Sequence, residues 1–138
     1  MFNLRYEDRL SEWRDFRDRL EVAEDPFTDL IEFYRNAPIV SIHTDPYDPT
    51  VWPSPWELIN ENQYDEFCVL LGMAYSLQLC DRFTGTTFEI HIGIDSKKSI
   101  TYYLLKIGDQ LISIYEKYGK QFPVGFQSQL IHKLDTPN

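Results

Sequence analysis

The sequence is poor in cysteine, and this bears on its redox environment. Its 138 residues include two cysteines, Cys68 and Cys80. If both lie on one helix, a rise of about 1.5 Å per residue separates them by about 18 Å, whereas the Cα atoms of a disulfide lie within about 7 Å. We therefore expect two free thiols, which are typical of a reducing cytoplasm.

Positive charge and long apolar runs are also scarce. Lysine and arginine number 13 against 22 aspartates and glutamates, which gives a formal net charge of −9. This charge repels phosphate, so we expect neither nucleic acid nor an anionic membrane as a partner; it favours a basic partner or simply aids solubility. No apolar run reaches the ~18 residues of a membrane span, and the chain is charged from Arg5 onward, so we expect a cytoplasmic protein without a signal peptide.

Several motifs with known chemistry are missing as well. The sequence has no glycine-rich phosphate loop, no Gly-x-Ser-x-Gly elbow, no zinc-ligand spacing and no internal repeat. These absences argue against a P-loop nucleotide site, an α/β-hydrolase nucleophile and a zinc finger. We expect no cofactor.

What is present suits one compact domain over residues 1–138. Hydrophobic residues make up 43% of the chain and aromatic residues 15%, enough to fill a core. We divide the chain into an N-terminal helical arm (1–37), a Pro/Trp-rich loop (38–55), a core of helix plus β-meander (56–116) and a C-terminal segment (117–138).

The stretch 64–77 is the strongest helix signal. After a polar first turn it is apolar on every side, which is typical of a helix buried all round. We expect Asn62 to cap it, Asp65 to lie in its first turn, and Gly72 to allow another element to pack closely. Amphipathic spacing predicts an earlier helix over residues 5–23, and Asp25-Pro26 and Ser54-Pro55 each read as a cap followed by a first-turn proline.

Strand patterns follow the central helix. Residues 88–94 alternate, with isoleucines on one face and Glu89 and His91 on the other. Further strands are expected over 99–107 and 110–115. The fold class is therefore α+β: N-terminal helices and a buried central helix packed on a three-stranded antiparallel β-meander.

Three segments in the middle of the chain resemble the transglutaminase-like, papain-like enzymes. They are the lead-in Trp52-Pro53-Ser54-Pro55-Trp56-Glu57-Leu58, the helix start Tyr64-Asp65-Glu66-Phe67-Cys68, and the strand Ile90-His91-Ile92. The resemblance implies a cysteine nucleophile at the helix start and a histidine on the strand, here Cys68 and His91.

The sequence departs from that pattern at two points. Asp65 occupies the expected nucleophile position, and Cys68 lies one turn deeper, where burial raises a thiol pKa. The second strand also carries no carboxylate to serve as the third catalytic residue. We therefore expect Cys68 to be buried and unreactive, and an enzyme of this type, if any, to rely on Asp65, Cys68 and His91.

Two other kinds of site compete with simpler interpretations. His43 and Asp45 are candidate metal ligands on an extended segment, but Asp45 and Asp48 each precede a proline and are typical of Asx turns. Glu89 and His91 form a candidate acid–base pair if their strand face lines a cleft; if that face is solvated, both are ordinary surface residues.

An interaction surface is the remaining candidate. Aromatic residues are enriched at binding hot spots, and long irregular segments are often functional. We expect binding where the Pro/Trp-rich loop meets the polar strand face, through Tyr47, Trp52, Trp56, Glu89 and His91. The favoured function is a non-catalytic protein-binding domain with a protein partner or self-association; the alternative is a degenerate transglutaminase-like or cysteine-peptidase-like enzyme.

A second resemblance spans most of the chain. The segments Ser41-Ile42-His43-Thr44-Asp45-Pro46, Trp52-Pro53, 73–79 and Phe88-Glu89-Ile90-His91-Ile92 resemble uncharacterised small proteins of large tailed marine bacteriophages. The resemblance implies no particular activity. It implies expression in the cytoplasm of an infected bacterial host.

Overall fold

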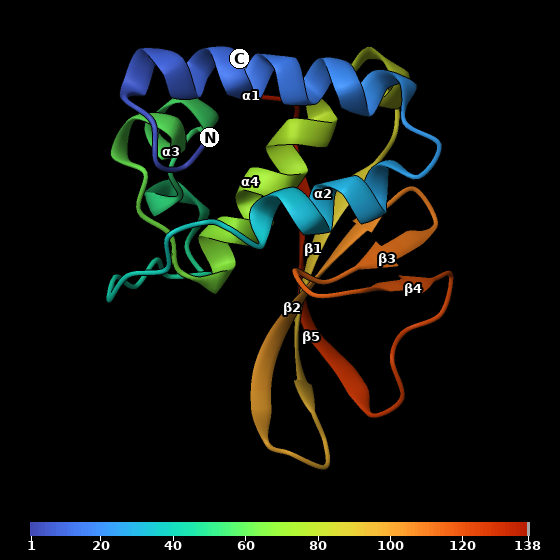
Figure 1. Cartoon of the computed structure of the whole chain (residues 1–138). Helices are drawn as coiled ribbons and strands as arrows, with labels where there is room; N and C mark the ends of the chain where they lie inside the picture. Colours follow the sequence, from blue (N-terminus) through green and yellow to red (C-terminus); the bar gives the residue numbers. More distant parts are fainter. Residues whose placement is uncertain (138) are drawn as a thin grey trace.

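The computed structural model describes residues 1–137 and confirms the α+β class (Figure 1). The helices of this part of the chain are α1 (Tyr6–Val22), α2 (Pro26–Tyr34), α3 (Pro55–Glu61) and α4 (Glu66–Gln78), with single 3₁₀ turns at Pro49–Val51 and Asp81–Phe83. The strands are β1 (Phe88–Asp95), β2 (Ile100–Ile107), β3 (Gln110–Ile112), β4 (Lys117–Gly119) and β5 (Phe126–Leu134).

The sheet is larger than the expected three-stranded meander. Residues 1–137 form five antiparallel strands in the order β4-β3-β2-β1-β5. The C-terminal segment supplies β4 and β5, and β5 pairs with β1 along its whole length. This pairing joins distant parts of the chain, so local alternation alone does not reveal it.

Helix α4 lies between the other helices and the sheet (Figure 1). Its apolar residues are buried on every side of the helix, as the sequence predicts. We call the sheet side that carries Ile90 and Ile92 the α4 face, because Phe67 of α4 packs there on Tyr103 of β2 with ring centroids 5.2 Å apart. The side that carries Glu89 and His91 is the outer face.

The helix caps follow from short-range chemistry, with one correction. Asp25 accepts the Thr28 N–H, and Ser54 forms a capping box with Glu57, both as predicted. Asn62, however, ends α3 in a left-handed conformation with φ 53°. Asp65 is the N-cap of α4. Asparagine tolerates positive φ, so it suits a helix end as well as a helix start.

The part of the outer face around His91 is covered rather than solvated. His91 is only 4% exposed, and Leu104 and Leu111 are buried on the same side. The C-terminal segment folds back here: the Phe122 ring lies 5.2 Å from the His91 ring and stacks on Phe126. The alternative in which His91 is an ordinary surface residue is therefore wrong, because a distant segment shields it.

Within residues 1–137, no helix is long and apolar enough to cross a membrane.

Candidate functional site

Cys68 and His91 lie on opposite sides of the sheet. Cys68 is 1% exposed on α4, and burial raises the pKa of its thiol to about 11. Its Sγ lies 3.2 Å from the Thr44 hydroxyl, while Asp65 accepts the N–H groups of Thr44 and Cys68. His91 points to the outer face, away from α4. The structure therefore does not bring Cys68 and His91 together.

His91 instead belongs to a row of interacting polar side chains on the outer face. Its Nδ1 lies 3.2 Å from the Ser128 hydroxyl and its Nε2 lies 3.3 Å from a Glu89 oxygen, with the Lys106 ammonium 3.9 Å from that oxygen. These are the residue types of an acyl-transfer triad. Such catalysis also needs a cleft for substrate and oxyanion donors. None of these residues lines the cavity described below.

The Pro/Trp-rich loop does not meet His91 in a groove. Trp52 packs between Phe67 and His132, with ring centroids 5.1 and 5.0 Å away, and its indole N–H donates to the Asp45 carbonyl. His132 pairs with Ile90 across β1 and β5, so Trp52 lies on the α4 face. The predicted site that joined Trp52 to Glu89 and His91 is therefore wrong, since the sheet separates them.

The other aromatic candidates are dispersed. Trp56 packs edge-on against Trp13, with ring centroids 5.6 Å apart. Tyr47 is 53% exposed at the tip of the loop. Neither side chain, nor that of Trp52, lines the cavity described below.

The loop aspartates form the turns that the sequence predicts. Asp45 Oδ1 accepts the Tyr47 N–H at 2.9 Å, and Asp48 Oδ1 accepts the Thr50 N–H at 3.1 Å. Both are Asx turns. Among residues 1–137, no group of three or more His, Cys, Asp or Glu side chains is placed to hold a metal ion. In this part of the chain, His43 and Asp45 therefore do not belong to a group of three such side chains.

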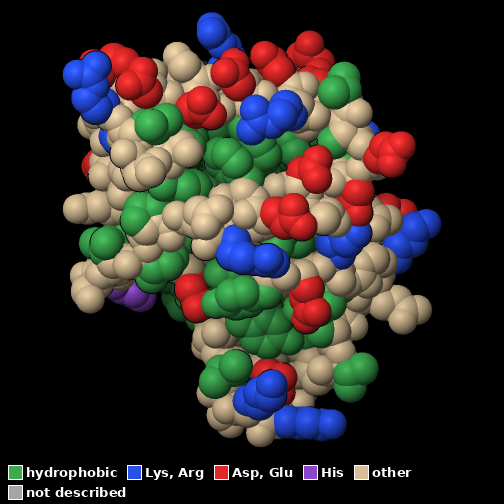
Figure 2. All heavy atoms as spheres, viewed as in Figure 1, with side chains coloured by type: hydrophobic (Ala, Val, Ile, Leu, Met, Phe, Trp, Pro, Cys, Tyr) green, Lys and Arg blue, Asp and Glu red, His purple; other side chains and the backbone are tan. Residues whose placement is uncertain are grey.

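A cavity of about 430 Å³ lies beside β2, where sequence analysis expected no site. Its lining combines four tyrosines with acidic side chains: Glu66, Asp95, Lys98, Ile100, Thr101, Tyr102, Tyr103, Ser113, Ile114, Tyr115, Glu116, Tyr118, Pro123 and Val124. In the view of Figure 2, hydrophobic side chains gather in the lower half of the molecule, near the position of β2 in Figure 1.

The cavity exists because β3 ends early. β3 pairs with β2 only at Leu105–Ile107. After Ile112 the chain curls into a turn in which the Ser113 N–H donates to the Glu116 carbonyl, and the Ser113 hydroxyl accepts the N–H groups of Tyr115 and Glu116. A serine side chain that bonds its own backbone in this way competes with strand pairing.

Half of the β2 edge is consequently open. Within residues 1–137, no strand pairs with Ile100–Leu104 on the side of β3. Along a strand, the N–H and C=O groups of successive residues point alternately to one neighbouring strand and to the other. Ile107 closes the two-residue turn to β3, so its N–H and C=O groups point toward β3. Tyr103 and Thr101 therefore direct their N–H and C=O groups to the open side.

Sequence reasoning missed this edge for an identifiable reason. A third strand over residues 110–115 would cover β2 as far as Tyr102 in the observed register. The structural strand stops three residues sooner. The only sequence feature that indicates an earlier end of this strand is Ser113 followed by Glu116, and it is a weak indication.

The rim of the open edge is apolar, and the lining of the cavity beside it is acidic. Ile100, Tyr115 and Val124 are 51%, 68% and 90% exposed. Three carboxylates line the cavity, those of Glu66, Asp95 and Glu116, against the single ammonium of Lys98. The Tyr115 hydroxyl donates to Glu66 at 3.0 Å, and partial burial together with this carboxylate raises the pKa of Tyr115.

The other sheet edges carry protection that the open half of β2 lacks. Proteins blunt exposed edges with bulges, short strands, lysine or proline. β5 has a register shift opposite Ile92 and Gly93 and carries Lys133. β4 is three residues long and begins with Lys117. The open half of β2 reads Ile-Thr-Tyr-Tyr-Leu, with neither charge nor proline.

The chain is significantly similar to no family model, no curated protein and no solved structure. A function for it is therefore proposed from its own contacts and charges.

Proposed function

We propose that this domain is a non-catalytic protein-binding module that captures an extended segment of a partner protein by strand addition to β2. The observation that carries the proposal is the unpaired half-strand Ile100–Leu104 beside the cavity of about 430 Å³. Strand addition uses backbone hydrogen bonds for affinity and pockets for alternate side chains for specificity.

The geometry suits a short segment that continues the line of β3. Two N–H and two C=O groups, from Thr101 and Tyr103, are directed to the open side. Alternate side chains of an added strand point to opposite faces. On the α4 face they meet Tyr103 and Tyr115, and on the outer face they meet Tyr102.

The energetics favour a transient complex. Each backbone hydrogen bond contributes about 0.5–1.5 kcal/mol net, and apolar burial adds about 25 cal/mol per Å². Association costs several kcal/mol of lost freedom. We therefore expect weak and rapidly reversible binding.

A second copy of the chain is the competing occupant. Two open edges would bring Glu66, Asp95 and Glu116 of one copy close to the same residues of another, and like charges close together disfavour binding. The two free cysteines suit our proposal that the interaction takes place in a reducing cytoplasm.

The test uses two substitutions at one position. Thr101→Pro removes an N–H that pairs with no strand in the free protein, and proline is tolerated at sheet edges. Thr101→Val keeps the N–H and the branched side chain. Peptides selected with the wild-type protein from a random linear library should bind Thr101→Val equally and Thr101→Pro at least about tenfold more weakly.

The contacts and the fold are measured alongside affinity. Bound peptide should shift the backbone amide NMR signals of residues 100–104. If Thr101→Pro does not fold, N-methylation of the selected peptide replaces it and should weaken binding to the wild-type protein. Failure to select any peptide, equal affinity for Thr101→Pro and Thr101→Val, or a concentration-dependent dimer through this edge overturns the proposal.

A further inference from the structure

We infer that the captured segment is cationic and carries a lysine or arginine that enters the cavity on the α4 face, between Tyr103 and Tyr115 and against Glu66. This inference rests on the proposed strand addition and assigns its ligand chemistry.

The position of the cation follows from the strand geometry. A residue placed opposite Tyr103 in an added strand directs its side chain to the same face as Tyr103. Phe67 of α4 packs on that face of Tyr103, and Glu66 precedes Phe67 in the first turn of α4. A long side chain opposite Tyr103 therefore extends toward the start of α4.

The Glu66 carboxylate is held ready at that place. It is exposed, and the Tyr115 hydroxyl donates to its Oε1 at 3.0 Å. Glu66 and Asp65 both contribute to raising the pKa of Tyr103, after the larger effect of burial, which places their negative charge near its ring. A guanidinium or ammonium here gains an ion pair and contact with two aromatic rings.

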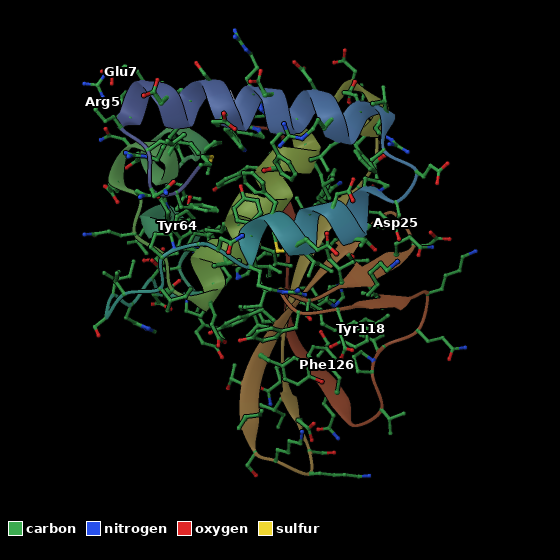
Figure 3. All side chains as sticks on the ribbon, viewed as in Figure 1. Arg5, Glu7, Asp25, Tyr64, Tyr118 and Phe126 are labelled. Carbon is green, nitrogen blue, oxygen red and sulfur yellow. The ribbon has the colours of Figure 1, made fainter. Side chains whose placement is uncertain are left out.

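The outer-face side of the cavity has a different character. Tyr102, Tyr118 and Val124 line it, and the Tyr102 ring packs on Phe126 with centroids 4.9 Å apart. Figure 3 shows Tyr118 and Phe126 below β4, over the lower part of the sheet. The Asp95 carboxylate already accepts the N–H groups of Lys97 and Lys98. Apolar residues at the alternate positions of the segment fit this side.

The net charge of the whole chain also favours a cationic segment. The chain carries a formal net charge of −9, and complementary charge raises association rates while it disfavours wrong partners. A cationic segment is attracted, whereas an acidic segment or a second copy of this chain is repelled.

The test varies one residue of a synthetic peptide, Val-X-Val-Thr-Val, blocked at both ends, with X as Lys, Ser or Glu, so that X opposite Tyr103 leaves the peptide within Ile100–Leu104. Valine faces one side and X the other when the peptide adds as a strand. Fluorescence anisotropy with the full chain at low salt should give affinity in the order Lys, Ser, Glu, with at least about a tenfold gap between Lys and Glu. Salt should narrow that gap.

Two protein variants localise the effect. Glu66→Gln removes the charge and keeps an oxygen for the Tyr115 hydroxyl, so it should weaken the Lys peptide about three- to tenfold and leave the Ser peptide unchanged. Glu7→Gln is the matched control, because Glu7 is exposed on α1 at the far end of the molecule (Figure 3). It removes the same charge and should leave both affinities nearly unchanged.

The outcomes separate this inference from the proposed function. If the Ser peptide binds as tightly as the Lys peptide, or if Glu66→Gln behaves as Glu7→Gln, the cationic assignment is wrong while strand addition stands. If the wild-type protein binds none of the three peptides, or if Thr101→Pro binds them as the wild type does, strand addition itself fails.

Discussion

The backbone of Gly72 on α4 lies directly against the ring of Tyr34 on α2. A Cβ at Gly72 would approach Cε1 of Tyr34 to 2.8 Å, and the Tyr34 hydroxyl donates to the Gly72 carbonyl at 3.0 Å. The same hydroxyl lies 2.9 Å from Ser76 Oγ, and burial raises the pKa of Tyr34 to about 12. Glycine thus permits the close approach of two helices that the sequence predicts.

This contact predicts the sign of a stability change. Replacing a glycine by alanine in an exposed helix interior stabilises it by about 1 kcal/mol. At Gly72 we expect Gly72→Ala to destabilise the protein by about 1–3 kcal/mol, because the buried Tyr34 ring must move. Chemical denaturation measures this. A variant that is as stable as the wild type, or more so, would show that Gly72 has free space beside it.

The buried thiol of Cys68 predicts a specific pH dependence. Its pKa rises from 9.0 to about 11 through burial, while the Thr44 hydroxyl lowers it and the Asp65 charge raises it. Thiol labelling of the native protein should therefore be slow at pH 7–9 and accelerate toward about pH 11. The denatured chain is the control, since both cysteines should then label rapidly. Fast native labelling of Cys68 at neutral pH would contradict this and restore the enzyme hypothesis.

The raised pKa of the Cys68 thiol also makes the free energy of unfolding depend on pH. The unfolded chain releases the thiol proton near pH 9.0, whereas the folded chain retains it to about pH 11. Rising pH thus favours the unfolded state across that interval. The stabilising effect of the protonated thiol is complete below pH 9 and is lost as the pH passes about 11.

His91 predicts a difference between two neighbouring substitutions. His91 is 4% exposed, contacts Phe122 and hydrogen-bonds Ser128 and Glu89. We expect His91→Ala to cost about 1–3 kcal/mol, since it removes a buried ring that packs on Phe122. Gln127→Ala is the control, because Gln127 is exposed on β5, and it should cost less than about 1 kcal/mol. Equal small effects in thermal unfolding would show that the C-terminal segment does not shield His91.

The sequence by itself determined the local elements. Asp25-Pro26 and Ser54-Pro55 begin helices because the cap, the proline and the first turn lie within four residues. Helix α4 is buried because it is apolar on every side. The β1–β2 hairpin follows from alternation and a short turn. Each of these signals lies within one element or between elements that are adjacent in the chain.

Only the tertiary structure decided the candidate site. β5 adds to β1 across more than thirty residues of chain, and Phe122 then covers His91. Ser113 ends β3 because its hydroxyl bonds the following backbone, a choice that competes closely with one more strand pair. The open edge of β2 is a backbone property that depends on which strand does not pair there. Side-chain patterns record which face is buried, and they carry no signal for an edge that lacks a neighbour.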